Sequence, residues 1–211
     1  MNENPWKNGA SILHYGLESQ TNIAELNKTV TEILSHRSYD GIIACFKELL
    51  ALSEMTDPEQ LVTKEKMLEQ KQEELTRYRI ELIKEGTLLR QLRLTNDTYA
   101  EVVRNEIEEA RNYYNHGGET DPNKEDFRFR KDMIGKRIQE LTTSQKVAES
   151  FSPQIRISED NCFKMADRIW DTLVSVMPLL RSKIAMENSK TILSQTRKMI
   201  RDALNDMEKP F

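Results

Sequence analysis

Two short clusters contain the side chains best suited to bind a ligand, and each centres on an arginine. They read Pro153-Gln154-Ile155-Arg156 and Pro178-Leu179-Leu180-Arg181, with Lys183 close behind. The candidate functional residues are therefore Gln154, Arg156, Pro178, Arg181 and Lys183. Along one straight helix the two arginines would lie ~37 Å apart, so they cannot share one small anion. Each acts separately, through partner residues on other helices or across an oligomer, or serves as a packing or ion-pair residue.

Residue types suited to catalysis or metal binding are present but not grouped. Cys45 and Cys162 sit in apolar helical patterns without a CxxC or Cys/His spacing. The three histidines are scattered: His14, His36 and His116. Nothing matches a zinc-binding HExxH helix, a GxSxG nucleophile turn or a phosphate-binding glycine loop. We predict a protein that is not an enzyme and that has no cofactor and no metal site.

The composition is typical of long helices with much surface in water. The chain is 31% charged, 37% hydrophobic and 7% aromatic, with only 7 Gly and 6 Pro among 211 residues. This profile predicts an all-α, elongated molecule. The formal net charge of -4 argues against a dedicated nucleic-acid binder, which needs a concentrated basic face.

Two shorter helices are expected near the N-terminus, within residues 9–55. The first runs from about Ser11 to His36, and Ser38-Tyr39-Asp40-Gly41 breaks it. The second carries a group of apolar residues and ends before Thr56-Asp57-Pro58-Glu59, which has the pattern of a helix start. Its apolar residues are Ile42, Ile43, Phe46, Leu49 and Leu50.

A long helix is predicted over residues 57–115, up to a loop at residues 116–123 that contains Gly117-Gly118. Leucines repeat along it every seven residues, the spacing that keeps one seam against a partner helix. These leucines are Leu61, Leu68, Leu75, Leu82 and Leu89. Lys64, Lys71 and Glu85 interrupt the second seam. We therefore expect a monomer in which the helix packs inside the chain, in place of a two-stranded dimer.

A return helix is predicted over residues 121–209. It is kinked near residues 152–153, where Ser152 could cap a new turn that starts with Pro153, and Pro178 offers a second place for a kink. One face carries an apolar stripe of Cys162, Met165, Ile169, Leu173, Val176, Leu180 and Ile184. The expected fold is one domain over residues 1–211: an antiparallel long-helix hairpin with coiled-coil character, packed at one end with the two N-terminal helices.

The environment of the chain also follows from its pattern. No apolar run approaches the ~20 residues needed to span a bilayer, and the N-terminal residues lack a signal-peptide core, so we expect a cytoplasmic protein. The C-terminal region is the one distinctly basic part: Arg181, Lys183, Lys190, Arg197, Lys198 and Arg201. It is either a solvated face or a contact surface for anionic lipid, as in peripheral membrane binding, or for an acidic partner.

Four segments, taken together, resemble the TelA/KlaA family of toxic-anion (tellurite) resistance proteins. The two arginine-centred clusters look like that family's PQIR-type and PLW-type motifs, although Leu180 stands where the family has tryptophan. The other two are HYGLESQTNIAEL, from His14, and the run from Leu75 to Tyr114. The resemblance implies a non-catalytic protein that binds or scaffolds in a stress response, with a membrane-associated XpaC-like protein as partner. The alternative is a general coiled-coil adaptor with no direct role in anion resistance.

Overall fold

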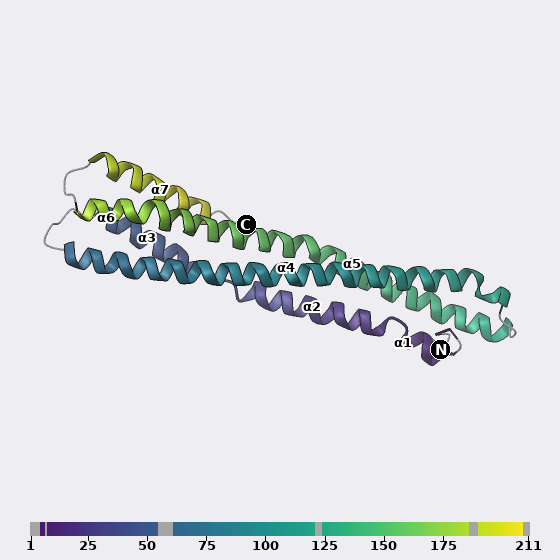
Figure 1. Cartoon of the computed structure of the whole chain (residues 1–211). Helices are drawn as coiled ribbons and strands as arrows, with labels where there is room; N and C mark the ends of the chain where they lie inside the picture. Colours follow the sequence, from purple (N-terminus) through teal and green to yellow (C-terminus); the bar gives the residue numbers. More distant parts are fainter. Residues whose placement is uncertain (1–4, 7, 55–60, 121–123, 186–189, 209–211) are drawn as a thin grey trace. The chain divides into compact units, whose positions relative to one another are not determined.

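All regular elements that the structure describes are helices (Figure 1). The computed structural model describes residues 5–6, 8–54, 61–120, 124–185 and 190–208, and these ranges contain no strand. The elements are α1 (Gly9–His14), α2 (Leu17–Ser35), α3 (Asp40–Glu54), α4 (Leu61–Thr120), α5 (Lys124–Asp171), the π-helix η2 (Thr172–Val176), α6 (Met177–Ala185) and α7 (Lys190–Glu208). The prediction of an all-α fold is confirmed.

The helices group into two compact units, where the sequence analysis expects one domain. Unit 1 comprises Met1–Ser35 and Leu89–Ile157, and unit 2 comprises His36–Leu88 and Ser158–Phe211. Unit 1 therefore holds α1, α2 and one part each of α4 and α5. Unit 2 holds α3, the remaining parts of α4 and α5, and the three C-terminal elements.

The two long helices each bury one line of residues spaced by seven. On α4 the line consists of Leu68, Leu75, Leu82, Leu89, Asn96, Val103 and Ala110, and on α5 of Phe127, Ile134, Leu141, Ala148, Ile155, Cys162 and Ile169. Every one of these residues is at most 9% exposed. The leucine seam predicted on α4 is thus buried from Leu68 to Leu89, whereas the side chain of Leu61 lies outside the described residues.

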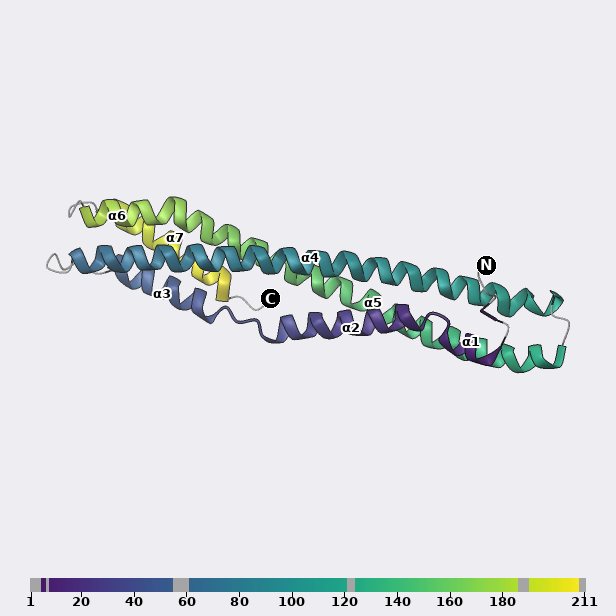
Figure 2. The ribbon, with the colours of Figure 1, turned by 60° about the horizontal axis from the view of Figure 1, so that its bottom comes forward.

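Within unit 1, α4 and α5 run in opposite directions. The side-chain amide of Asn96 donates to the carbonyl of Ala148 at 2.7 Å, and Ala110 shares a core cluster with Ile134. Helix α2 lies along this pair (Figure 2) and buries Ile23 against it. The N-terminal aromatic ring also packs here: the centroid of Trp6 lies 4.4 Å from that of Tyr15 and 5.3 Å from that of Tyr113.

Within unit 2, α4 and α5 come close at a glycine. A Cβ on Gly86 would lie 3.0 Å from the Cβ of Cys162 and from the ring of Phe163, so a larger residue would need its neighbours to shift. Helix α3 packs beside α4, where Cys45 lies against the carbonyl of Lys71. Helix α7 packs on α3, α6 and η2. Helix α3 thus lies between its contacts with α4 and α7.

The predicted first helix is two helices, because the chain breaks at Gly16. This glycine has a φ of 66°, the left-handed region that side chains disfavour. A Cβ there would also lie 2.7 Å from Oε2 of Glu106 and 2.9 Å from Leu141. The expectation of one helix from Ser11 to His36 is therefore wrong, while the break before α3 at Asp40 is as expected.

The long helix extends past its predicted end. Helix α4 continues through Gly117 and Gly118 to Thr120, so the expected loop at residues 116–123 begins later than predicted. A glycine costs only ~1 kcal/mol relative to alanine inside a helix, which a long packed helix can absorb. The predicted start signals at residues 56–59 and 121–122 lie outside the described residues.

The return helix over residues 121–209 is not a single helix. Helix α6 ends at Ala185, and α7 is a separate helix that packs back on α6 and η2. Asp206 near the end of α7 accepts from Arg168 of α5 at 2.9 Å, which fixes the reversed direction. The reversal buries four apolar residues that an extended helix would expose: Ile200, Ala203, Leu204 and Met207.

Pro153 and Pro178 both lie within helices. A return helix that continues across Pro153 was predicted from the sequence. Helix α5 passes through Pro153, and Ser152 does not cap a new turn, because its hydroxyl donates to Asp97 at 2.7 Å. The π-helix η2 directly precedes α6, and the N–H of Met177 donates to the carbonyl of Thr172, five residues back. Pro178 lacks an N–H, so a wider turn before it is a local way to accommodate the proline.

The buried seam can be tested with one pair of substitutions on α4. Leu75 is 0% exposed and Ile80 is 46% exposed, and both lie in unit 2. We expect Leu75→Ala to lower the free energy of unfolding by about 2–5 kcal/mol, because it leaves a cavity in the core. The matched Ile80→Ala should change it by less than about 0.5 kcal/mol. Urea unfolding followed by circular dichroism measures both, and equal effects would contradict the assignment of the seam.

Candidate functional site

The five predicted site residues fall into two groups in different units. Gln154 and Arg156 lie on α5 in unit 1, and both side chains are exposed. Pro178, Arg181 and Lys183 lie on α6 in unit 2. Each group is therefore described within its own unit.

Arg156 forms no hydrogen bond or ion pair with any described residue. The same holds for Gln154. An ion-pair role for Arg156 consequently has no partner in the part of the chain that the structure describes. Its guanidinium projects into solvent and is available for an external contact.

Arg181, in contrast, connects two helices of unit 2. Its Nη2 donates to Oε1 of Gln72 on α4 at 2.6 Å, and its side chain is exposed. It lines an open groove of about 600 Å³ that runs along α4. The groove is otherwise lined by Glu69, Gln72, Glu73, Thr76, Arg77, Ile80, Glu81 and Lys84. Arg181 thus forms a hydrogen bond to a neutral amide that links α6 to α4, and no ion pair with a described residue.

Lys183 lies at the C-terminal end of α3. Its ammonium donates to the carbonyl oxygen of Ser53, and Nη2 of Arg197 on α7 donates to the same oxygen at 3.3 Å. The last carbonyls of a helix have no partner within the helix and carry the negative end of its dipole. The two cations therefore cap α3, and their hydrogen bonds attach α6 and α7 to its end.

Positive charge gathers at this cap. Burial lowers the pKa of Lys183, and the nearby charges of Arg197 and Lys64 lower it further. Lys64 on α4 is only 5% exposed. Neither Lys183 nor Arg197 forms an ion pair with a described carboxylate. We call Lys64, Lys183 and Arg197 the cationic cluster.

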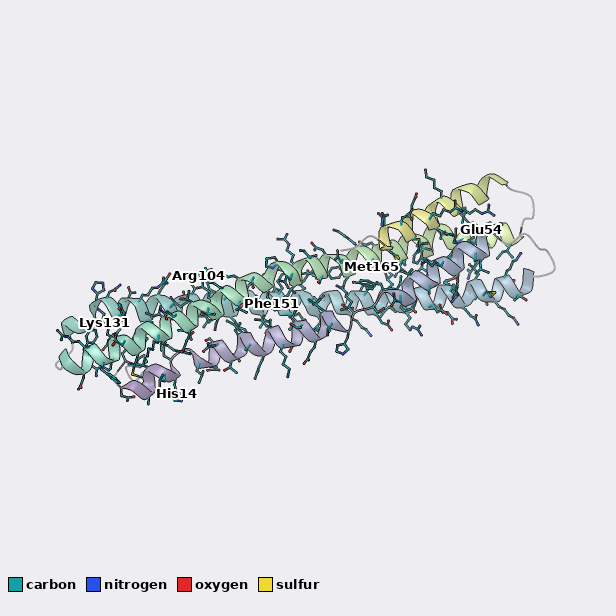
Figure 3. The ribbon with its side chains drawn as sticks, turned by 180° about the vertical axis from the view of Figure 1, so that it is seen from behind. His14, Glu54, Arg104, Lys131, Phe151 and Met165 are labelled. Atoms are coloured by element: carbon teal, nitrogen blue, oxygen red, sulfur yellow. The ribbon has the colours of Figure 1, made fainter. Side chains whose placement is uncertain are left out.

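The predicted basic C-terminal region is partly used within the fold. Arg201 donates to Glu54 at 3.3 Å, and Glu54 marks the end of α3 in Figure 3. With Lys183 and Arg197 at the same helix end, three of the six basic residues contact α3. Lys198 is exposed, whereas the side chain of Lys190 lies outside the described residues. Sequence reasoning missed Ser53 and Lys64 as members of this site, although Lys64 already stood out as a charge on the second seam.

Two of the three charges that interrupt the second seam of α4, Lys71 and Glu85, form ion pairs with described residues. Nζ of Lys71 lies 2.5 Å from Glu48 of α3 and 2.8 Å from Glu74. Burial alone lowers the pKa of Lys71, but the two carboxylates outweigh it and raise the pKa above its ordinary value. Nε of Arg37, just before α3, lies 2.9 Å from Glu85. The polar seam is thus the surface on which α3 and its preceding segment pack.

Both cysteines lie next to these ion pairs, and both are buried. Burial raises the pKa of Cys45 to about 12, against an opposing effect of Lys71. Burial likewise raises the pKa of Cys162 to about 11, although Arg37 touches its sulfur and favours the thiolate. Raised pKa values keep both sulfurs protonated at neutral pH and therefore poorly nucleophilic.

Unit 1 contains a polar network that sequence reasoning did not identify. Arg137, 4% exposed, donates to the carbonyl of Tyr15 at 2.6 Å and to Gln20 at 2.9 Å, so it caps α1 where the chain turns at Gly16. Glu106 accepts from Ser19 at 2.8 Å. Burial raises the pKa of Glu106, while Ser19 and Arg137 act in the opposite direction.

The described residues contain neither a metal-binding group nor a membrane-spanning helix, and no comparison with known proteins gave a match. Among the described residues, no group of three or more His, Cys, Asp or Glu side chains could hold a metal ion. No helix in the described ranges is long and apolar enough to cross a bilayer. No protein-family model, no curated protein and no solved structure matches this chain.

The protonated state of the thiols predicts slow alkylation. At pH 8 a thiol with a pKa near 11 is roughly one part in a thousand thiolate. We expect neither Cys45 nor Cys162 to react with iodoacetamide in the folded protein, and both to react in urea. Mass spectrometry of the alkylated protein measures this, and rapid labelling of native Cys162 would show that Arg37 outweighs burial.

The raised pKa of Glu106 predicts a pH-dependent stability. The folded protein binds this proton more readily than the unfolded chain, so the contribution is largest at low pH and is lost as the pH rises through the folded pKa. Relative to Glu106→Gln, the wild type should therefore lose stability as the pH rises above 4.5, the ordinary value. Urea unfolding from pH 4.5 to 8 measures the difference.

The control for this prediction is Glu108→Gln, which changes an exposed carboxyl on the same helix. Its stability difference from the wild type should depend much less on pH. A flat difference for Glu106→Gln would mean that Arg137 and Ser19 fully offset burial.

Proposed function

We propose that this is a non-enzymatic protein of the toxic-anion or tellurite resistance type, which acts by binding or scaffolding in a stress response. The support from sequence is the resemblance of four segments to the TelA/KlaA family. Two of these segments contain Arg156 and Arg181. The proposal includes the cytoplasm as the compartment and a monomer as the working form.

The observation that carries the proposal is the cationic cluster at the end of α3. Lys183, from one of the resembling segments, meets Arg197 on a single carbonyl oxygen, with Lys64 close by. Such a concentration of positive charge favours anions by Coulomb attraction. It provides a physical basis for anion handling that needs no nucleophile, redox centre or metal.

The finer architecture belongs to the same proposal. We propose that α4 and α5 form one antiparallel hairpin with coiled-coil character, an elongated scaffold on which the N-terminal helices pack. The buried lines of residues spaced by seven support it, as do the antiparallel contacts between α4 and α5 in unit 1. A protein partner, such as a membrane-associated XpaC-like protein, would bind surfaces that the fold leaves exposed, including Arg156. Peripheral membrane contact through the C-terminal helix would use Lys198.

The second candidate is a general adaptor with no direct role in anion resistance. One observation favours it: Trp170 on α5 is 48% exposed, and the guanidinium of Arg79 lies 4.6 Å from its ring centroid. Val174, four residues on, is also exposed. Tryptophan and arginine are enriched among the residues that dominate protein interfaces. Such a surface would bind a partner protein whether or not an anion is present.

Growth across a tellurite series separates the two candidates. Cells lacking this gene are complemented with wild type, Arg156→Ala, Arg181→Ala or Lys183→Met at matched abundance. We expect wild type to protect and Lys183→Met to protect several-fold less, because it removes a charge from the cluster. Arg156→Ala is informative because no described residue pairs with Arg156, so loss of protection would indicate an external contact.

The control is Lys146→Met, which removes an equal charge from an exposed position of α5. It should protect as well as the wild type. If the wild type itself gave no protection, the resistance function would be wrong and the adaptor would become the leading candidate.

A further inference from the structure

Unit 2 leaves a group of apolar side chains open to solvent on α4, α5 and η2. Trp170 of α5 is 48% exposed, Val174 of η2 is 47% exposed and Ile80 of α4 is 46% exposed. Trp170 and Val174 are four residues apart, so they lie on one face of the helical chain. A tryptophan gains much from burial, so its exposure indicates a surface that is covered in a complex.

Arg79 of α4 lies over this tryptophan and lacks a polar partner. Its guanidinium carbon is 4.6 Å from the ring centroid of Trp170. None of its five N–H donors has an acceptor among the described residues, and Nε is shielded from water. Asp167 and Asp171, on either side of Trp170 in the sequence, form no ion pair with it. A shielded guanidinium N–H without an acceptor is costly, so this place favours a carboxylate from outside the described chain.

The groove beside Arg79 has the length of a short helix. It includes Ile80 and also Thr76, which lies one turn before Arg79 on the same side of α4. Along α4 its lining extends from Glu69 to Lys84, or ~22 Å at 1.5 Å per residue. About four turns of a partner helix would fill that length. Helices that bind in this way place a stripe of apolar residues in the groove.

The groove contains charges of both signs, which disfavours a strongly charged partner. Its acidic and basic residues are Glu69, Glu73, Glu81, Arg77, Lys84 and Arg181. Nucleic acid and anionic membranes bind concentrated basic surfaces. A single unpaired arginine beside apolar side chains instead suits a protein segment with one well-placed carboxylate.

From these observations we infer that Arg79, Trp170, Val174 and Ile80 form a docking surface for an amphipathic helix of a partner protein. The apolar stripe of that helix covers Trp170 and Val174. An acidic residue at the border of the stripe accepts hydrogen bonds from the guanidinium of Arg79. Tryptophan and arginine are the residue types that contribute most when an interface covers them.

The inference rests on the proposed binding or scaffolding role, because it names a surface and a class of partner for that role. Its test is nevertheless separate from growth on tellurite. A partner contact at this surface without protection would keep the docking surface and reject the resistance function. Protection by a chain whose surface contacts no partner would reject the docking surface alone.

Photocrosslinking in cells that express the full chain tests the contact. A photoreactive benzoylphenylalanine takes the place of Val174 or, as a control, of Met199, which is 39% exposed on α7 of the same unit. Mass spectrometry identifies the crosslinked segment. We expect the probe at position 174 to capture one protein, through a segment whose apolar residues recur every three or four positions beside an Asp or Glu.

Variants of the purified full chain then measure the contribution of each side chain to binding of a synthetic peptide with the captured sequence. Trp170→Ala and Arg79→Gln should each weaken binding about ten-fold or more, because such residues dominate the affinity of interfaces. Lys164→Gln removes an exposed charge from α5 in the same unit and should bind as the wild type does. Circular dichroism verifies that each variant is folded.

Two kinds of result would overturn the docking surface. Capture at position 174 no greater than at position 199, or equal peptide affinity of all variants, would show that no partner helix binds there. Crosslinks to a second copy of the chain, to lipid or to another part of the same chain would show that a different group covers Trp170. The crosslinking comparison stands even if a variant fails to fold.

Discussion

The structure depends on supplying partners for the ionisable groups that line one side of α4. A seven-residue leucine seam can be buried by one partner helix, but the adjacent positions carry Lys71, Glu85 and Glu106. Each is met by a group from an earlier element: Glu48, Arg37 and Ser19 respectively. A buried charge without a partner is among the most costly features in a protein, so these pairings restrict where α2 and α3 can pack.

The same principle explains the end of α3. The free carbonyls of α3 attract Lys183 and Arg197, and these contacts hold α6 and α7 against the helix end. Along the seam of α4, in contrast, Lys71 and Arg37 each face a carboxylate.

Several local features were predictable because they depend on residues close together in the chain. The break before Asp40, the buried leucines from Leu68 to Leu89 and helical continuity through Pro153 follow from spacing and from the properties of proline. The split at Gly16 was not predicted. Its backbone is left-handed, and Glu106 and Leu141, which lie about ninety or more residues away in sequence, leave no room for a Cβ there.

Composition and periodicity were enough to predict the helical class, the buried seam of α4 and the lack of a redox or metal motif around the two cysteines. The reversal of α7, the capping of α1 by Arg137 and the meeting of Lys64, Lys183 and Arg197 depend on contacts between distant segments. The difference lies in the sequence distance over which each interaction acts. Helical periodicity reports which face of a segment is buried, but it contains no information on which distant helix end will meet a given cation. That choice depends on which packing satisfies the charges and the unpaired carbonyls together.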